Sequence, residues 1–153
     1  MVLTAEELTR IRAQAEAEYP AECCGVVLAR GGAAPERVLM PCRNVQDDKH
    51  REDPAAFPRE SREAYYMDPR DLLAIGRREA QGYAVAVIYH SHIDVGAYFS
   101  ATDRQNALMD GEPTYPDAVY VVVSVMGGRA VDARAFSWDA ASRDFAPAEL
   151  VTG

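Results

Sequence analysis

The chain has 153 residues, of which 48% are hydrophobic and 26% are charged, so it has the length of one domain with a complete core. Its 24 acidic residues outnumber its 16 basic residues, and the resulting net charge of −8 argues against a nucleic-acid-binding surface. No apolar run reaches the ~18 residues that span a bilayer, and the first residues do not resemble a secretory signal. We therefore expect a single cytoplasmic domain over residues 1–153, with neither nucleic acid nor a membrane as partner.

The first half of the chain predicts one helix followed by a hairpin. Thr4 and Glu7 have the spacing of a capping box, and apolar residues at helical spacing then predict a helix over residues 5–19. Two apolar segments around a Gly-Gly pair predict a β-hairpin, with strands over residues 24–30 and 37–40.

The next segment is polar. Residues 44–62 have neither helical nor strand periodicity, which predicts a long loop, and residues 63–67 resemble a short strand. Asp68 is followed by proline, which predicts a helix cap and a second helix to about Gln81. The continuous apolar run over residues 83–89 is typical of a strand buried on both faces.

The last third predicts a helix and three strands. Ser100 is placed to cap a third helix of about ten residues, and strands are predicted over 118–125, 129–137 and 143–150. Helices thus alternate with strands along the chain. This order predicts a mixed α/β fold in which helices flank a central sheet.

Three cysteines, Cys23, Cys24 and Cys42, form neither an even disulfide set nor a C-x-x-C pair. Adjacent cysteines are poorly placed to bridge each other. We expect three free thiols, and we interpret Cys23 and Cys24 as small strand residues rather than metal ligands.

Two of the three histidines, His90 and His92, follow the buried strand and lie two residues apart. Side chains at positions i and i+2 of a strand project from the same face, so both imidazoles can reach one point. Catalytic zinc takes three protein ligands and leaves a fourth position for water. The pair therefore predicts a zinc site, whose third ligand is Asp103 in the first turn of the third helix or Asp94, which is nearer in sequence.

A hydrolytic zinc site also needs a base that takes a proton from water and passes it to the leaving amine. A carboxylate can do this. Glu22 precedes the first strand, and it lies beside His90 if the first strand and the histidine-bearing strand are neighbours in the sheet.

These residues resemble the motif of the JAMM, or MPN-plus, zinc metalloproteases. That motif is an upstream Glu, then His-Ser/Thr-His, seven residues, Ser, two residues and Asp. The chain has Glu22, His-Ser-His over 90–92, seven residues, Ser100, two residues and Asp103. Around Glu22 the sequence is similar to the compact bacterial branch of the family, and the resemblance extends from the first helix to about residue 136.

The resemblance implies that His90, His92 and Asp103 bind zinc, that Glu22 is the general base and acid, and that Ser100 stabilises the oxyanion. It also implies a single three-layer α/β domain of the MPN type, similar to the cytidine deaminases in layout. Ser100 and Asp103 have in addition the spacing of an ordinary helix cap, and the two roles can coexist.

The chain departs from the family pattern at two positions. Ile93 and Phe99 stand where the family usually has proline, directly after the second histidine and directly before the serine. Neither residue is a ligand. Without these prolines the loop over the metal is expected to differ in rigidity, which would alter zinc affinity or activity.

The function implied by the resemblance is a zinc-dependent metallopeptidase or isopeptidase. Its substrate would be an amide bond at the C-terminus of a ubiquitin-like or sulfur-carrier protein with a Gly-Gly tail. The alternatives are a non-catalytic MPN-type protein-binding module and an amidase for small conjugates. We expect the loop over 44–62 to dock the substrate, whose extended tail can pair with an exposed sheet edge.

The remaining candidates are less specific. His50 lies in the polar segment and is expected to be solvated. Three tyrosines either line a substrate groove or pack in the core or at its rim: Tyr65, Tyr66 and Tyr98.

Overall fold

A computed structural model describes all 153 residues. A six-stranded sheet has the order β2-β1-β3-β6-β7-β8, and its neighbouring strands are antiparallel except β3 and β6. The helices are α1 (Ala5–Glu18), α2 (Gln46–Glu52), α3 (Pro69–Ala80) and α4 (Ala101–Ala107). The strands are β1 (Cys24–Arg30), β2 (Glu36–Cys42), β3 (Ala84–Ile93), β4 (Leu108–Met109), β5 (Glu112–Pro113), β6 (Val119–Met126), β7 (Arg129–Asp139) and β8 (Asp144–Ala148).

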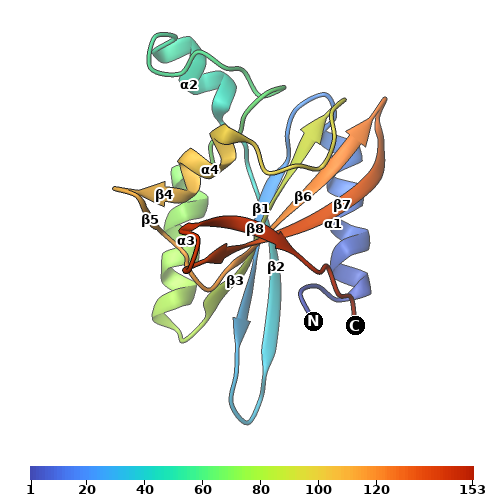
Figure 1. Ribbon diagram of the computed structural model, residues 1–153, viewed down its shortest axis with the longest axis vertical. Coiled ribbons are helices and arrows are strands. Elements are labelled where there is room, and N and C mark those ends of the chain that lie inside the picture. The colour runs from blue at the N-terminus through green and yellow to red at the C-terminus, as the bar shows by residue number, and fades with distance from the viewer.

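Helices cover both faces of the sheet, with α1 on one side and α3 and α4 on the other (Figure 1). Each face has its own apolar cluster. Ile11 and Ala15 of α1 pack in one cluster, while Ile75 of α3 and Ala107 of α4 pack in the other. Alternate residues of the central strands feed the two clusters, because successive side chains of a strand point to opposite faces. The predicted three-layer mixed α/β fold is confirmed.

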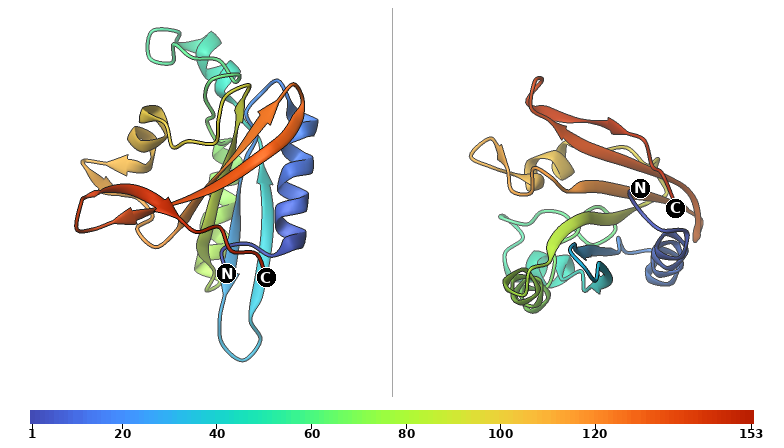
Figure 2. Two further views of the ribbon diagram at one scale, coloured as in Figure 1. Left: turned by 45° about the vertical axis from the view of Figure 1, so that its right-hand side comes forward. Right: turned by 90° about the horizontal axis from the view of Figure 1, so that it is seen from below.

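The two ends of the chain lie side by side in both views of Figure 2. Leu3 and Thr152 form an isolated parallel bridge there. The predicted capping box at the start of α1 is present, because the backbone N–H of Glu7 donates to Thr4 Oγ1 at 3.0 Å and that of Thr4 donates to Glu7 Oε2 at 2.8 Å. None of the helices is long and apolar enough to cross a membrane.

The prediction of a loop over the whole of 44–62 is wrong, because the segment contains α2. Gln46 is the only buried residue of this helix, so the sequence has no apolar period. Its charges match the helix dipole, since acids occupy the first turn and bases the last. His50 is half-buried rather than solvated, and its Nδ1 lies 2.8 Å from the carbonyl oxygen of Phe57.

The predicted strand over 63–67 is also wrong. Only Met67 lies in a bridge, opposite Asn44, and the two backbone hydrogen bonds of this bridge are made by the flanking residues Tyr66 and Asp68. The side-chain oxygen of Asn44 accepts the backbone N–H of Tyr66 at 3.0 Å, and its Nδ2 donates to the carbonyl of Ala64 at 3.2 Å. A single asparagine side chain thus replaces part of the strand ladder and holds this segment extended.

The third predicted helix is shorter than expected, with seven residues instead of about ten. The chain leaves α4 for the small β4–β5 hairpin, whose turn is formed by Asp110 and Gly111 with φ values of 52° and 78°. Asp-Gly is a preferred pair for a two-residue turn with two positive φ angles. The signal for this turn was present in the sequence.

A close approach between β1 and β3 depends on Gly25. Gly25 lies opposite Tyr89 in the strand register, and the phenol of Tyr89 donates to Gln14 Oε1 of α1 at 2.5 Å. A Cβ atom added at Gly25 would lie 2.2 Å from the Tyr89 hydroxyl oxygen and 2.3 Å from its ring carbon. Because the Tyr89 side chain is fully buried, the ring has no space into which to move.

We predict that Gly25→Ala lowers the free energy of unfolding by about 1–3 kcal/mol, since it overpacks the core. The control is Gly76→Ala in α3, where nothing lies within 4 Å of an added Cβ. There, alanine is expected to raise stability by about 0.5–1 kcal/mol. Urea unfolding followed by circular dichroism measures both, and equal effects of the two substitutions would contradict the close approach.

Candidate metal centre

Both histidines lie within β3 rather than beyond its end. β3 continues to Ile93, and it pairs with β1 on one side and with β6 on the other. His90 and His92 are buried, with 0% and 4% of their surface exposed. Their spacing directs both imidazoles to one point, as predicted.

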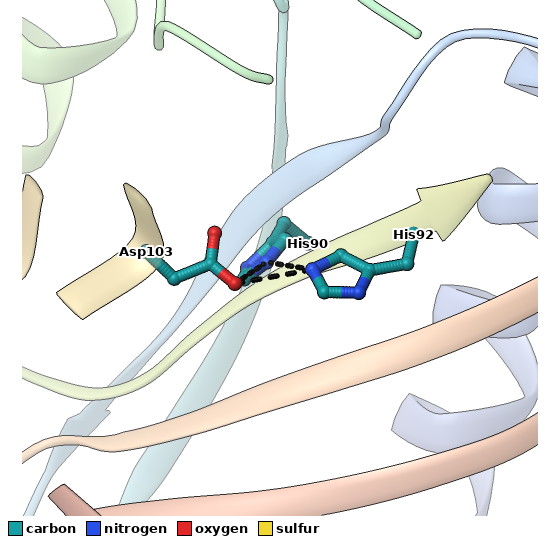
Figure 3. Close-up of side chains that lie close together, drawn as sticks. All are labelled: His90, His92 and Asp103. Atoms are coloured by element: carbon teal, nitrogen blue, oxygen red, sulfur yellow. Dashed lines mark hydrogen bonds and ion pairs between the residues drawn. The ribbon is translucent and has the colours of Figure 1, made fainter. Parts of the chain in front are cut away.

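The side chain of Asp103 meets the two imidazoles from α4 (Figure 3). The Nε2 atoms of His90 and His92 are 3.3 Å apart, and each lies 3.1 Å from Asp103 Oδ2. These atoms form a group placed to hold a metal ion. The structure therefore brings together the three residues that the motif assigns as ligands.

Hydrogen bonds to the backbone orient two of these side chains. His92 Nδ1 lies 2.9 Å from the carbonyl oxygen of Gly96. A hydrogen bond between them requires the proton on Nδ1, and it leaves the Nε2 lone pair free for a metal. The Ser100 and Asp103 pair forms a complete capping box, in which the N–H of Ser100 donates to Asp103 Oδ2 at 3.0 Å. The helix cap and the metal group thus share the same aspartate.

The electrostatic environment keeps Asp103 ionised. Burial raises its pKa, but the imidazoles of His90 and His92 and the backbone N–H of Ser100 outweigh burial and hold the pKa well below its usual range. An ionised carboxylate is the form that binds a metal ion.

Asp94, the alternative ligand, points away from the histidines. It has a left-handed backbone with φ 57°, and its carboxylate accepts hydrogen bonds from the Tyr19 hydroxyl at 2.8 Å, from Arg62 at 2.7 Å and from the Gly127 N–H at 2.7 Å. These contacts make Asp94 an anchor between three segments of the chain. It is not part of the metal group.

Glu22 is buried beside this group. The strands β1 and β3 are neighbours, as the prediction required, and Cys24 lies opposite His90 in the register. Burial first and the charge of Asp103 second raise the pKa of Glu22 to about 9. Its Oε1 atom is buried and has no hydrogen-bond partner in the protein. A buried carboxylate oxygen without a partner is costly, which suggests a role in chemistry.

Ser91, between the two histidines, fixes the start of β1. Its Oγ accepts the backbone N–H of Cys23 at 2.7 Å, and its own N–H donates to the Cys23 carbonyl at 3.1 Å. Glu22 directly precedes Cys23, and the backbone carbonyl of Glu22 accepts a hydrogen bond from Asn44 Nδ2 at 2.8 Å. Sequence reasoning missed both positioning residues. For Ser91 the signal was its place in the motif, whereas Asn44 has no local signal.

Two of the three candidate tyrosines flank the histidines. The Tyr65 ring stacks on His90 with centroids 4.7 Å apart, and the half-exposed Tyr98 ring meets His92 edge-on at 4.9 Å. Tyr66 packs against Phe57 instead. Each of the two histidines therefore has a tyrosine ring packed against it.

Apolar packing anchors the loop between the second histidine and α4 at the two positions where the family usually has proline. Ile93 is buried. Phe99 packs against three aromatic rings at centroid distances of 4.9–5.4 Å, those of Tyr120, Phe136 and Phe145. These contacts restrict the loop by burial rather than by a fixed φ angle.

All three cysteines are free thiols, as predicted, and all three are buried. Burial raises the pKa of Cys23 and of Cys42 to about 12. Such thiols stay protonated at neutral pH, which makes them poor nucleophiles.

A family model described as prokaryotic homologues of the JAB domain matches residues 4–140. The chain belongs to this family. The JAMM resemblance is thereby confirmed, and the match covers the metal group and the sheet as far as β7.

Similar proteins agree with this assignment. The desampylase of Haloferax volcanii is 32% identical over 121 residues, which are 78% of this chain and 74% of the relative. The CysO-cysteine peptidase of Mycobacterium bovis is 33% identical over 125 residues, 81% of this chain and 73% of the relative. A solved protein structure from Desulfitobacterium hafniense has a TM-score of 0.67 at 22% identity, covering 99% of this chain and 91% of its own, which shows the fold. With such relatives, this JAB-family chain is a hydrolase of peptide or isopeptide bonds.

We predict that Ser91→Ala lowers the free energy of unfolding by about 1–3 kcal/mol, because the buried N–H of Cys23 loses its acceptor. Ser142→Ala is the control, since this exposed serine makes only a surface hydrogen bond to Asp139. Urea unfolding measures both variants. A Ser91→Ala protein as stable as the control would show that this hydrogen bond does not hold β1 against β3.

Proposed function

We propose that the chain is a zinc-dependent peptidase that cleaves the amide bond after the Gly-Gly tail of a ubiquitin-like or sulfur-carrier protein. The observation that carries the proposal is the triangle of donor atoms formed by His90, His92 and Asp103. Glu22, Ser100 and the two flanking tyrosines supply the remaining support.

The dimensions of the triangle fit zinc. In a tetrahedral site with bonds of about 2.0–2.1 Å, ligand atoms are about 3.3–3.4 Å apart. The three donor–donor distances here are 3.1, 3.1 and 3.3 Å. Two imidazoles and one carboxylate leave a fourth tetrahedral position for water or substrate. Zinc in such a site acts as a Lewis acid and makes water acidic enough to lose a proton near neutral pH.

Glu22 is the proposed general base and acid. Its unpartnered Oε1 accepts the proton of the attacking water and returns it to the nitrogen of the leaving amine as the C–N bond breaks. The products are a free carboxylate on the tail and a free amine. Burial raises the pKa of Glu22 to about 9 and so favours its protonated form. A cation bound in the metal group favours the ionised form of Glu22 that this role requires.

Ser100 is the proposed oxyanion donor. Its Oγ accepts the backbone N–H of Asp103 at 3.0 Å, so its own hydroxyl proton is not used in the cap. That proton can donate to the negative charge that develops on the scissile carbonyl oxygen.

The aromatic surroundings of the site favour a Gly-Gly tail. The rings of Tyr65 and Tyr98 pack against the two imidazoles, so residues without side chains meet the least steric obstruction beside the metal group. The names of the two relatives, a desampylase and a CysO-cysteine peptidase, agree with cleavage of a protein conjugate.

A free backbone edge leads toward the histidines. Tyr66 and Asp68 use their backbone groups to pair with the segment around Asn44, whereas the N–H and C=O groups of Tyr65 and Met67 have no partner in the protein. Tyr65 and Met67 line a cavity of about 660 Å³. An extended substrate tail can add as a strand to this edge. Residues 56–59, from the segment predicted to dock the substrate, form another wall of this cavity.

We predict about one zinc ion per chain in protein purified without a chelator, and loss of zinc in His92→Ala, because two donors remain. The matched control is Asp94→Asn, which neutralises the carboxylate that was the alternative ligand and leaves the metal group intact. Elemental analysis measures the zinc content. A wild-type protein that stays free of zinc after reconstitution would refute the proposal and favour a non-catalytic binding module.

We predict that Glu22→Gln keeps zinc but lowers kcat by about 10²–10⁴-fold, because the amide cannot transfer the proton. Hydrolysis of a ubiquitin-like carrier extended beyond its Gly-Gly tail, followed by mass spectrometry, measures the rate. Unchanged activity in the zinc-loaded variant would remove Glu22 from the proposed chemistry.

A further inference from the structure

The two histidines of the metal group are oriented in different ways. His92 Nδ1 lies 2.9 Å from the carbonyl oxygen of Gly96, whereas His90 Nδ1 is buried and has no hydrogen-bond partner in the protein. A metal-bound imidazole usually donates its second ring N–H to an acceptor, and this hydrogen bond fixes the orientation of the ring. His90 lacks such a hydrogen bond, so another contact must set its orientation.

The ring of Tyr65 lies against the face of His90. The two rings are nearly parallel, with centroids 4.7 Å apart and an angle of 27° between their planes. Tyr98 instead meets His92 edge-on, at an angle of 70°. A parallel ring in contact prevents the imidazole from rotating out of its plane, because the rotation would drive the imidazole edge into the stacked face. The histidine without a hydrogen bond at Nδ1 is thus the one with a stacked ring.

The orientation of His90 decides whether its Nε2 lone pair points at the metal. The torsion that turns an imidazole about its Cβ–Cγ bond has broad energy wells, so packing must select one orientation when no hydrogen bond does. In the structure, His90 Nε2 lies 3.3 Å from His92 Nε2 and 3.1 Å from Asp103 Oδ2 (Figure 3). The stack with Tyr65 therefore keeps this donor atom at its corner of the triangle.

The backbone on both sides of Tyr65 is fixed by Asn44. The Nδ2 of Asn44 donates to the carbonyl of Ala64 at 3.2 Å, and its Oδ1 accepts the N–H of Tyr66 at 3.0 Å. The same Nδ2 also donates to the carbonyl of Glu22 at 2.8 Å. One asparagine side chain therefore holds both the segment that carries the stacked ring and the backbone of the proposed general base.

We propose that Tyr65 is a positioning residue for zinc binding, whose ring holds His90 in the orientation that binds the metal. The contact is made by the face of the ring, so the tyrosine hydroxyl is not needed for it. In this role Tyr65 contacts a ligand of the metal rather than the metal or the scissile bond. The inference rests on the proposed function, because it takes zinc as the metal, and it adds a residue outside the JAMM motif that sets zinc affinity.

The test measures the zinc dissociation constant of the full chain by competition with a chromogenic chelator. Tyr65→Leu removes the flat ring, and we expect it to raise the Kd about 10-fold, as loss of a contact that orients a metal ligand does. Tyr65→Phe keeps the ring without its hydroxyl and is expected to bind zinc like the wild type. If Tyr65→Leu fails to fold, Tyr65→Met, which is closer to tyrosine in length, carries the same expectation.

Tyr66→Leu is the matched control. Tyr66 is the next residue of the same segment, but its ring packs edge-on against Phe57 at 5.7 Å and not against a histidine. Its zinc Kd is expected to equal that of the wild type. An equal rise of the Kd in Tyr66→Leu would show that the stability of the segment, rather than the stack on His90, sets zinc affinity.

The outcomes separate this inference from the proposed function. An unchanged Kd in Tyr65→Leu, or a rise in Tyr65→Phe as large as that in Tyr65→Leu, would overturn the inference and leave the proposed function standing. A zinc-loaded wild type without peptidase activity would overturn the proposed function alone. A wild type that binds no zinc would overturn both.

Discussion

The antiparallel pairing of β1 with β3 determines where every part of the site lies. Gly25 lets the Tyr89 ring cross β1, and Cys24 then stands opposite His90. The hydrogen bonds between Ser91 and Cys23 extend this register to the residue next to Glu22. Because side chains alternate along a strand, a slip of one residue within β3 would turn both histidines toward α1 and away from Asp103. Register, rather than any single contact, is what the chemistry depends on.

The site collects ionisable groups in a place where water is scarce. Glu22, His90, His92 and Asp103 are all at most 7% exposed. Burial of so many such groups is unfavourable unless each is paired or bound to an ion. Two donors of the metal group are oriented by backbone hydrogen bonds, whereas His90 Nδ1 and Glu22 Oε1 have no partner in the protein. This combination of well-oriented donors and unpartnered atoms is typical of a site organised for a ligand.

Different elements hold different parts of the site, each by a different kind of interaction. The sheet holds the histidines rigidly through its apolar core, and α4 supplies Asp103 through its cap. The segment that includes α2 is polar and does not form part of the apolar core. Side-chain hydrogen bonds such as those of Asn44 hold it beside the site. Phe99 anchors the loop over the metal group by aromatic packing, where the family usually has proline. A buried ring and a restricted φ angle are two means to the same restriction of the loop.

The sequence by itself determined the elements with local signals: the capping box at Thr4, the apolar strands and the i, i+2 pair of histidines. The JAMM spacing added Glu22, Ser100 and Asp103, and the structure brings Asp103 to the histidines. The tertiary structure decided what no apolar periodicity encodes, namely the helix within 44–62 and the orientation of Asp94 away from the histidines. Periodicity reports which face of an element is buried, whereas these features depend on polar contacts between residues far apart in the chain. Such contacts exist only once the sheet has formed.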